Sequence, residues 1–239
     1  MKRTIYILIF ICLVVFAASA QSKSSEASSE DKKGFIGLSL GPAFSYTDFA
    51  SKDINNENAG FAKTGFNLNV SFGYRLGRHF GIAAMLCGNS NSFDNAGFEK
   101  IFSTLAQVNS TPWKSNGVMA GGYYSSASSK VSFEMRLVIG YANTTSPEIS
   151  VRLTDFSGAQ VDLLQESVSG GTLCSDFGVG LKAALSEKFS FLGNLDFYAT
   201  EPELSNVRTY IDGVLYDSST LKQRVSIITI TAGIAYNLK

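Results

Sequence analysis

Residues 64–76, TGFNLNVSFGYRL, alternate strictly between two kinds of side chain. After Thr64, the even positions carry large apolar residues, whereas the odd positions carry glycine, asparagine, serine and one arginine. Such alternation places all the large side chains on one face of a β-strand, while on a helix they would scatter round the circumference. A strand with one bulky apolar face and one small polar face is typical of a transmembrane barrel, with lipid outside and a lumen inside.

The same pattern recurs along the chain and predicts eight strands in all. Their expected ranges are about 34–46, 64–76, 80–90, 116–125, 131–141, 172–185, 189–198 and 224–239. Short turns near residues 77, 126 and 187 alternate with long loops near residues 55, 103, 157 and 211. The sequence therefore predicts an all-β fold, an eight-stranded antiparallel up-and-down transmembrane β-barrel with short periplasmic turns and long extracellular loops.

The loops and one strand carry further local signals. Apolar residues at helical spacing predict a short amphipathic helix, which we expect to rest as a lid on the barrel rim rather than bind a partner: Phe98, Ile101, Phe102 and Leu105. Residues 149–163 are expected to extend two strands beyond the membrane as a hairpin, and Asp212-Gly213 is a strong hairpin-turn signal. Pro42 lacks a ladder donor and predicts a bulge or a local irregularity of the strand.

The N-terminus has the features of a secretory signal. Lys2 and Arg3 precede an apolar run over residues 5–18, and Ala18-Ser19-Ala20 forms an A-x-A cleavage site. The run is short for a spanning helix, so an uncleaved anchor is the weaker alternative. We therefore expect a signal peptide over 1–20, cleaved after Ala20, a flexible leader over 21–33 and the barrel domain over 34–239.

Composition agrees with an apolar environment and excludes some partners. Charged residues make up only 17% of the chain, and it contains 18 Phe and 10 Tyr. Removal of the signal peptide leaves 18 basic and 20 acidic residues, a net charge of −2. No basic surface remains for nucleic acid, so no nucleic-acid partner is expected.

The inward faces of the predicted strands carry three charges of each sign: Arg75, Glu134, Arg136, Asp176, Lys182 and Asp196. Glu134 and Lys182 lie at similar distances from the turn ends of neighbouring strands, so we expect Glu134 to face Lys182 or Arg136. Side chains fill the interior of an eight-stranded barrel, and charges at membrane depth are usually paired. We expect this lumen charge network to plug and stabilise the barrel rather than form an ion pathway. A cation site between Asp176 and Asp196 is a less favoured alternative.

Catalytic signals are weak. The single histidine, His79, is in a tight turn, and the sequence shows neither a nucleophile–base pattern nor a metal-ligand cluster. We therefore expect no enzyme activity, catalytic residues, cofactor or metal site.

Cys87 and Cys174 face inward on strands three apart, a separation that disfavours a disulfide, although an oxidising compartment would permit one.

The last strand carries the most specific motif. The order polar, any, Gly, two of any, aromatic, any, hydrophobic is met by Thr231, Gly233, Tyr236 and Leu238. With the eight strands, this motif resembles the outer-membrane β-barrel domain family, the small OmpA/OmpX-like barrels of Gram-negative bacteria, over residues 34–239. Lys239 is a departure, because many members end on an aromatic residue. The resemblance implies a C-terminal insertion signal, read by the barrel-insertion machinery, and location in the cell outer membrane.

The expected function is non-catalytic. We expect an integral outer-membrane protein with a structural or interaction role, in adhesion or an envelope complex, through its extracellular loops. The expected partners are outer-membrane lipid or lipopolysaccharide and, during assembly, the insertion machinery; the chain is expected to be a monomer, and the sequence does not name the loop partner. The alternatives are a soluble secreted lipocalin-like ligand-binding barrel, a small outer-membrane pore and a lipid-modifying barrel enzyme.

Overall fold

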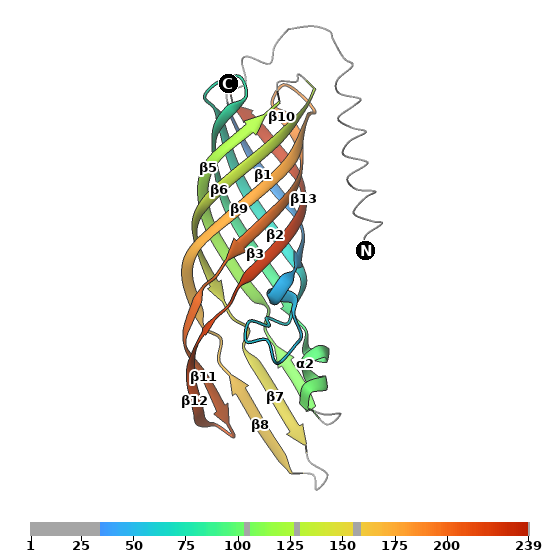
Figure 1. The fold of residues 1–239 in the computed structure, drawn as a ribbon. Helices are drawn as coiled ribbons and strands as arrows, with labels where there is room; N and C mark the ends of the chain where they lie inside the picture. The colour runs from blue at the N-terminus through green and yellow to red at the C-terminus, as the bar shows by residue number, and fades with distance from the viewer. Residues whose placement is uncertain (1–33, 103–105, 127–129, 155–158, 239) are drawn as a thin grey trace.

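The computed structural model describes residues 34–102, 106–126, 130–154 and 159–238. The predicted signal peptide and flexible leader, and Leu105 of the predicted helix, lie outside the described residues. Within them, eight strands form a closed antiparallel barrel, so the predicted fold is confirmed (Figure 1). These strands are β1 (Gly34–Ser45), β2 (Ala62–Arg75), β3 (Phe80–Phe93), β5 (Trp113–Ser125), β6 (Val131–Thr145), β9 (Ser169–Ala184), β10 (Phe189–Thr200) and β13 (Val225–Leu238).

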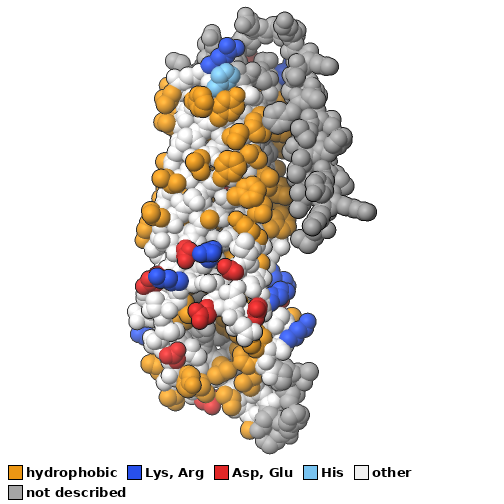
Figure 2. All heavy atoms as spheres, viewed as in Figure 1, with side chains coloured by type: hydrophobic (Ala, Val, Ile, Leu, Met, Phe, Trp, Pro, Cys, Tyr) orange, Lys and Arg blue, Asp and Glu red, His pale blue; other side chains and the backbone are white. Residues whose placement is uncertain are grey.

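The side chains that alternate along the sequence point alternately outward and inward from the barrel wall. Outward side chains such as Leu38 and Ile139 are 53% and 68% exposed, whereas the inward Asn69 and Val138 are buried. Figure 2 shows the resulting apolar surface over the wall of the barrel. Exposed aromatic residues lie toward both ends of the wall: Phe66, Tyr74, Phe80, Tyr141, Phe189 and Tyr236. Lipid-facing bands of this kind, flanked by aromatic residues, are those of outer-membrane barrels.

The long loops build a second sheet at one end of the barrel. Its order is β12-β11-β8-β7-β4 (Figure 1). The strands are β4 (Ala106–Ser110), β7 (Ile149–Thr154), β8 (Gln160–Gln165), β11 (Glu203–Ile211) and β12 (Val214–Lys222). The two predicted hairpins are β7–β8 and β11–β12. Asp212 and Gly213 have φ angles of 48° and 80°, as a two-residue hairpin turn requires.

Two short helical segments lie at this end of the barrel: α2 (Asn95–Phe102) contacts β4 of the second sheet, and the 3₁₀ turn η1 (Thr47–Ala50) contacts the barrel strands β2 and β13. The predicted amphipathic helix is therefore confirmed. The irregularity predicted at Pro42 is a gap in the β1–β13 ladder and not a bulge. The pairing omits Gly41 and Pro42, while Leu40 pairs with Ala232 and Ala43 with Thr229, which is one register on both sides of the proline. A missing N–H leaves a gap in the ladder but does not require an extra residue.

Candidate functional site

Arg136 is the centre of a buried ion-pair cluster in the lumen. Its Nη2 lies 2.5 Å from Asp196 Oδ1, and its Nε lies 3.8 Å from Asp176 Oδ1. Both carboxylates are buried. The guanidinium occupies the position between the two aspartates for which a cation site was the alternative. Paired charges of this kind stabilise a barrel interior only while all the partners are present.

Register explains how Arg136 reaches across the barrel wall. Arg136 on β6 pairs with Gly178 on β9, and Gly178 pairs with Asp196 on β10, so the three residues form one row. A Cβ on Gly178 would overlap with the Asp196 carboxylate and lie 2.8 Å from Arg136 Nε. The glycine therefore leaves the space in which the two charged side chains meet.

The other three predicted charges lie nearer the short turns. Glu134 pairs with Gly180 in the β6–β9 ladder and Lys182 with Ser132, so Glu134 and Lys182 are diagonal neighbours. Glu134 lies within electrostatic range of Lys182, Arg136 and Arg75. Lys182 Nζ also lies 4.1 Å from the centroid of the Phe35 ring. This layer has a formal charge of +1, which balances the −1 of the Arg136 cluster.

The lumen is closely filled at this depth. Arg75 Nη2 donates a hydrogen bond of 3.2 Å to Ser125 Oγ. Glu134, Arg136, Phe35 and Tyr123 help to line a cavity of about 20 Å³, room for about one water molecule. A space of this size does not provide a continuous aqueous path.

The cysteines lie close together in the lumen but are not bonded. Cys87 and Cys174 are buried free thiols on β3 and β9. Gly117 on β5 lies between them, because a Cβ built there would be 3.2 Å from Cys87 Sγ and 3.5 Å from Cys174 Sγ. The intervening strands β5 and β6 keep the two backbones apart, which agrees with the expected difficulty of a disulfide.

The mouth of the barrel on the loop side is closed by aromatic side chains. Phe49 of η1 is 1% exposed and makes an edge-to-face contact with Trp113, with ring centroids 5.6 Å apart. Trp113 Nε1 donates a hydrogen bond of 2.8 Å to Gly60 O. Both rings belong to the same buried cluster as the inward Tyr198 and Ile227. The segment after β1 therefore folds into the mouth.

The predicted helix rests on the rim without supplying this closure. Phe98 of α2 packs edge-to-face on Phe61 and Phe93, at centroid distances of 5.1 Å and 5.4 Å. Phe49 was not predicted from the sequence, because it is one of three large apolar residues in the first long loop, with Ile54 and Phe61, and no local pattern distinguishes it from them.

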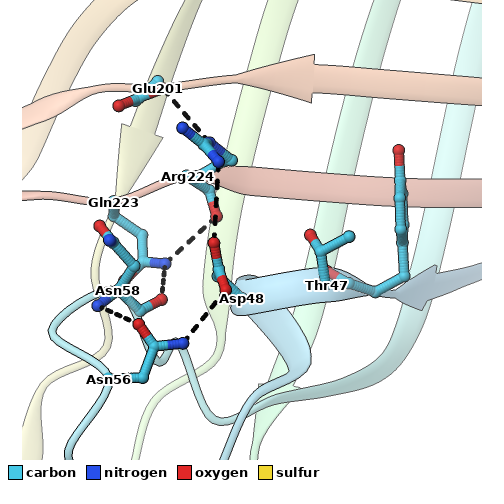
Figure 3. A network of polar contacts seen from close by, with 8 residues as sticks. Thr47, Asp48, Asn56, Asn58, Glu201, Gln223 and Arg224 are labelled. Atoms are coloured by element: carbon cyan, nitrogen blue, oxygen red, sulfur yellow. Dashed lines mark hydrogen bonds and ion pairs between the residues drawn. The ribbon is translucent and has the colours of Figure 1, made fainter.

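A polar network fastens the η1 segment to the barrel (Figure 3). Arg224, beside the start of β13, lies 3.8 Å from Asp48 and 3.4 Å from Glu201. Asn56 Nδ2 donates to Asp48 Oδ1 at 3.1 Å, and Gln223 Nε2 donates to the Asn58 carbonyl at 2.9 Å. These contacts join the first long loop to the fourth, which fixes the position of Phe49 over the mouth.

Asp94 fastens the other side of this segment. Lys52 Nζ contacts its carboxylate closely, and Lys63 Nζ lies 3.9 Å away. Asp94 also caps α2, since its carbonyl accepts from Phe98 N at 2.9 Å and its carboxylate accepts from Gly97 N. The bond from Lys52 is the main cause that holds the pKa of Asp94 below its ordinary value, and the Gly97 N–H lowers this pKa further.

The contacts of His79 are with a backbone carbonyl and an aromatic ring. Its Nδ1 lies 3.2 Å from Ser125 O, and its ring stacks on Tyr124 with centroids 5.6 Å apart. Among the described residues, no group of three or more His, Cys, Asp and Glu side chains could hold a metal ion. Within the same part of the chain, no helix is long and apolar enough to cross a membrane.

The four residues of the C-terminal motif lie on the closing strand β13. Thr231 is buried and accepts a hydrogen bond of 3.3 Å from Asn194, and Gly233 pairs with Ser39 on β1. Tyr236 is 42% exposed on the outer wall and Leu238 pairs with Gly34. The motif therefore has two residues toward the lumen and an aromatic residue toward lipid.

Comparisons with known proteins give one family match and several structural neighbours. The family model described as "Outer membrane protein beta-barrel domain" matches residues 8–237. The chain is similar in structure to Ail, the attachment invasion locus protein of Yersinia pestis, with 17% identity, TM-score 0.44 and coverage of 86% of this chain and 99% of that chain. For a major outer membrane protein from Thermus thermophilus, the identity is 12%, the TM-score is 0.46, and 86% of this chain and 99% of that chain are covered. For the outer membrane protein OprG from Pseudomonas aeruginosa, the identity is 12%, the TM-score is 0.39, and 87% of this chain and 97% of that chain are covered.

No curated protein matches the chain. On the family match, together with the closed barrel and its apolar wall, the chain belongs to the outer-membrane β-barrel domain family and is an integral protein of the bacterial outer membrane.

Proposed function

We propose that this protein is a non-catalytic surface protein that binds partners through its extracellular sheet. The observation that carries the proposal is the apolar tip of that sheet. Val214, Leu215 and Tyr216 follow the β11–β12 turn and are 69%, 53% and 74% exposed, outside the lipid-facing wall. Figure 2 shows apolar side chains at this end of the molecule, separated from the apolar wall by a charged zone. Large exposed apolar groups beyond the membrane mark an interaction site.

The closed lumen supports an interaction role over a pore. The Arg136 cluster and the Phe49–Trp113 contact occupy the interior and the mouth, respectively. The lone histidine bonds to a backbone carbonyl in a turn and gives no support to a lipid-modifying activity. The outward apolar wall likewise argues against a lipocalin-like soluble barrel.

The remaining partners are also part of the proposal. Outer-membrane lipid would cover the apolar wall, and lipopolysaccharide phosphates would meet rim lysines such as Lys52 and Lys63, whose side chains are 60% and 56% exposed. The insertion machinery would read Thr231, Gly233, Tyr236 and Leu238 during assembly. The chain would be a monomer within its own membrane.

The test compares cells that produce the full chain with cells that produce a tip variant, Val214→Ser, Leu215→Ser and Tyr216→Ser. The measurement is adhesion to other cells and to protein-coated surfaces, with cells lacking the chain as background. We expect the variant to lose most of the adhesion while its band still shifts on boiling in a gel, as an intact barrel does. A matched control replaces Leu76 and Leu185 with serine, since they are 71% and 65% exposed near the opposite end. Wild-type adhesion no higher than background, or a steady conductance across a planar bilayer, would refute the proposal.

A further inference from the structure

We infer that one face of the extracellular sheet binds an amphipathic helix of a partner protein, with apolar residues on the bound side of that helix and a basic residue at its flank. This inference deepens the proposed interaction role by naming the form of the partner, and it rests on that role. Two neighbouring residues of β7 name the two faces of the sheet, which are the Val151 face and the Arg152 face.

The Val151 face is apolar across the whole sheet. Residues that pair directly on neighbouring strands lie on the same face. One row of aliphatic side chains therefore crosses all five strands from β4 to β12: Val108, Val151, Leu163, Ile211 and Val214. The next row toward the β7–β8 turn is also apolar and consists of Ala106, Leu153 and Val161. On the Arg152 face, the row between these two is polar: Gln107, Arg152 and Asp162.

The five-residue row is buried at its β4 end and open at its β12 end. Val108 and Val151 are both 4% exposed and belong to the buried cluster against which Phe98 of α2 packs. The two middle residues of the row are half-buried, and Val214 at the other end is 69% exposed. Within the described residues, the row therefore continues a packed core into an exposed surface. An exposed apolar surface of this kind marks an interaction site.

The face of a sheet favours a helix over an extended segment as its occupant. The backbone groups of β7, β8 and β11 pair with strands on both sides, so the face offers side chains and no hydrogen bonds to a second backbone. An extended segment pressed on it would bury its own N–H and C=O groups without partners, whereas a helix satisfies these groups internally. The open part of the row spans β8, β11 and β12, which is two strand spacings of about 5 Å each and matches the diameter of about 10 Å of one helix.

A carboxylate beside the open part of the row determines the charge at the flank of the helix. Asp217 pairs with Thr209, and Thr209 pairs with Gln165, so the three residues form the next row toward the barrel on the Val151 face. Asp217 is exposed, and the other two residues carry no charge. A basic side chain at the flank of the bound helix would therefore lie opposite a complementary charge.

The first test uses a synthetic amphipathic helix of leucine and lysine with one cysteine on its apolar side, and a peptide of the same composition in scrambled order. The full chain carries Val161→Cys or Leu164→Cys in a background with Cys87→Ala and Cys174→Ala. These two positions are a matched pair, because both lie on β8, are 37% and 36% exposed, and face opposite sides of the sheet. We expect disulfide cross-linking of the helical peptide to Val161→Cys and little to Leu164→Cys. Equal cross-linking at the two positions, or equal cross-linking of the two peptides, would overturn the inference.

The second test separates this inference from the proposed function. Val214→Asp places a charge in the open part of the row and should weaken binding of the helical peptide by about tenfold, because a buried valine contributes at least this factor. Cells with this variant should lose most of their adhesion. Leu215→Asp is the matched control, because Leu215 pairs with Tyr210 on the Arg152 face and is also exposed. It should keep both activities, and both variants should keep the boiling shift of the barrel.

The pattern of adhesion distinguishes the two failures. Adhesion that is lost equally in both variants, lost with Leu215→Asp alone or kept in both would overturn the inference. The proposed function would still stand if the triple tip variant lost adhesion. Wild-type adhesion at the background level would refute the proposed function, and the inference with it.

Discussion

Arg136 and Asp196 meet at 2.5 Å although a whole strand, β9, separates their backbones. The contact exists because the residue between them in the row is Gly178. The pair therefore depends on one missing side chain as much as on the two charges.

Arg136→Met should lower the free energy of unfolding by about 3–5 kcal/mol, because it leaves Asp176 and Asp196 buried without their cation. Guanidinium chloride unfolding in detergent micelles measures the change. Asp176→Asn is the control, since it removes one excess negative charge and leaves the closer Arg136–Asp196 pair intact. It should be clearly less harmful. Equal losses in the two variants would contradict the assignment of Arg136 as the shared partner.

Gly178→Ala should destabilise the barrel by about 1–3 kcal/mol, because the new methyl group overlaps with the Asp196 carboxylate. Gly193→Ala is the matched control on the neighbouring strand, where the nearest atom would be Phe191 Cε1 at 3.6 Å. The same unfolding measurement applies to both. A control that loses as much stability as Gly178→Ala would show that any strand glycine has this effect.

Phe49→Ala should open the mouth on the loop side and make the lumen thiols reactive. Cys87 and Cys174 are buried beneath the Phe49–Trp113 contact, so a small methanethiosulfonate reagent should modify them slowly in the wild type. Mass spectrometry of the modified chain measures the rate. Phe49→Leu keeps most of the volume and should stay close to the wild type. Fast modification of the wild type would show that Phe49 does not close the mouth.

Acid should release the η1 segment through Asp94. The bond from Lys52 lowers the pKa of this carboxyl in the folded chain, so its contribution is present above its unfolded value and is lost as pH falls through the folded value. Trp113 is the single tryptophan of the chain and bonds to Gly60 at the end of the segment. Its emission should be constant from neutral pH to about pH 4 and shift to longer wavelength below it.

The control for this titration is Asp94→Asn, which should show part of the shift already at neutral pH. The expected change is small, because Lys52 is exposed and solvent screens its charge. Identical curves for Asp94→Asn and the wild type would assign the acid transition to other carboxyl groups.

The barrel could be predicted from the sequence because lipid imposes a strict rule on every strand. Positions such as Leu38 and Ile139 must be apolar, and their neighbours in the chain must fit a narrow lumen. The predicted ends of the strands were less accurate. β6 was expected to end at residue 141 and ends at Thr145, since ladder pairing continues beyond the apolar band. The hairpin at Asp212-Gly213 was predictable because its turn requires positive φ angles.

The extracellular sheet and the closed mouth were harder to predict. β4 has five residues and pairs with β7, which is distant in the chain, so its local pattern is weak. The cover by Phe49 depends on how the first long loop meets Trp113 and Arg224. The Arg136–Asp196 contact depends on the relative register of three strands, which the alternation within each strand does not determine.

The pairing of Gly34 with Leu238 closes the barrel between the first strand and the last. An even number of strands returns the chain to the side on which it entered, so a fusion partner at either end of the barrel would remain in the periplasm. A peptide meant for display to the medium belongs instead at Asp212-Gly213, where the backbone already turns at the far end of the extracellular sheet. Antibody labelling of such an insertion on intact cells would report topology without disturbing the lumen.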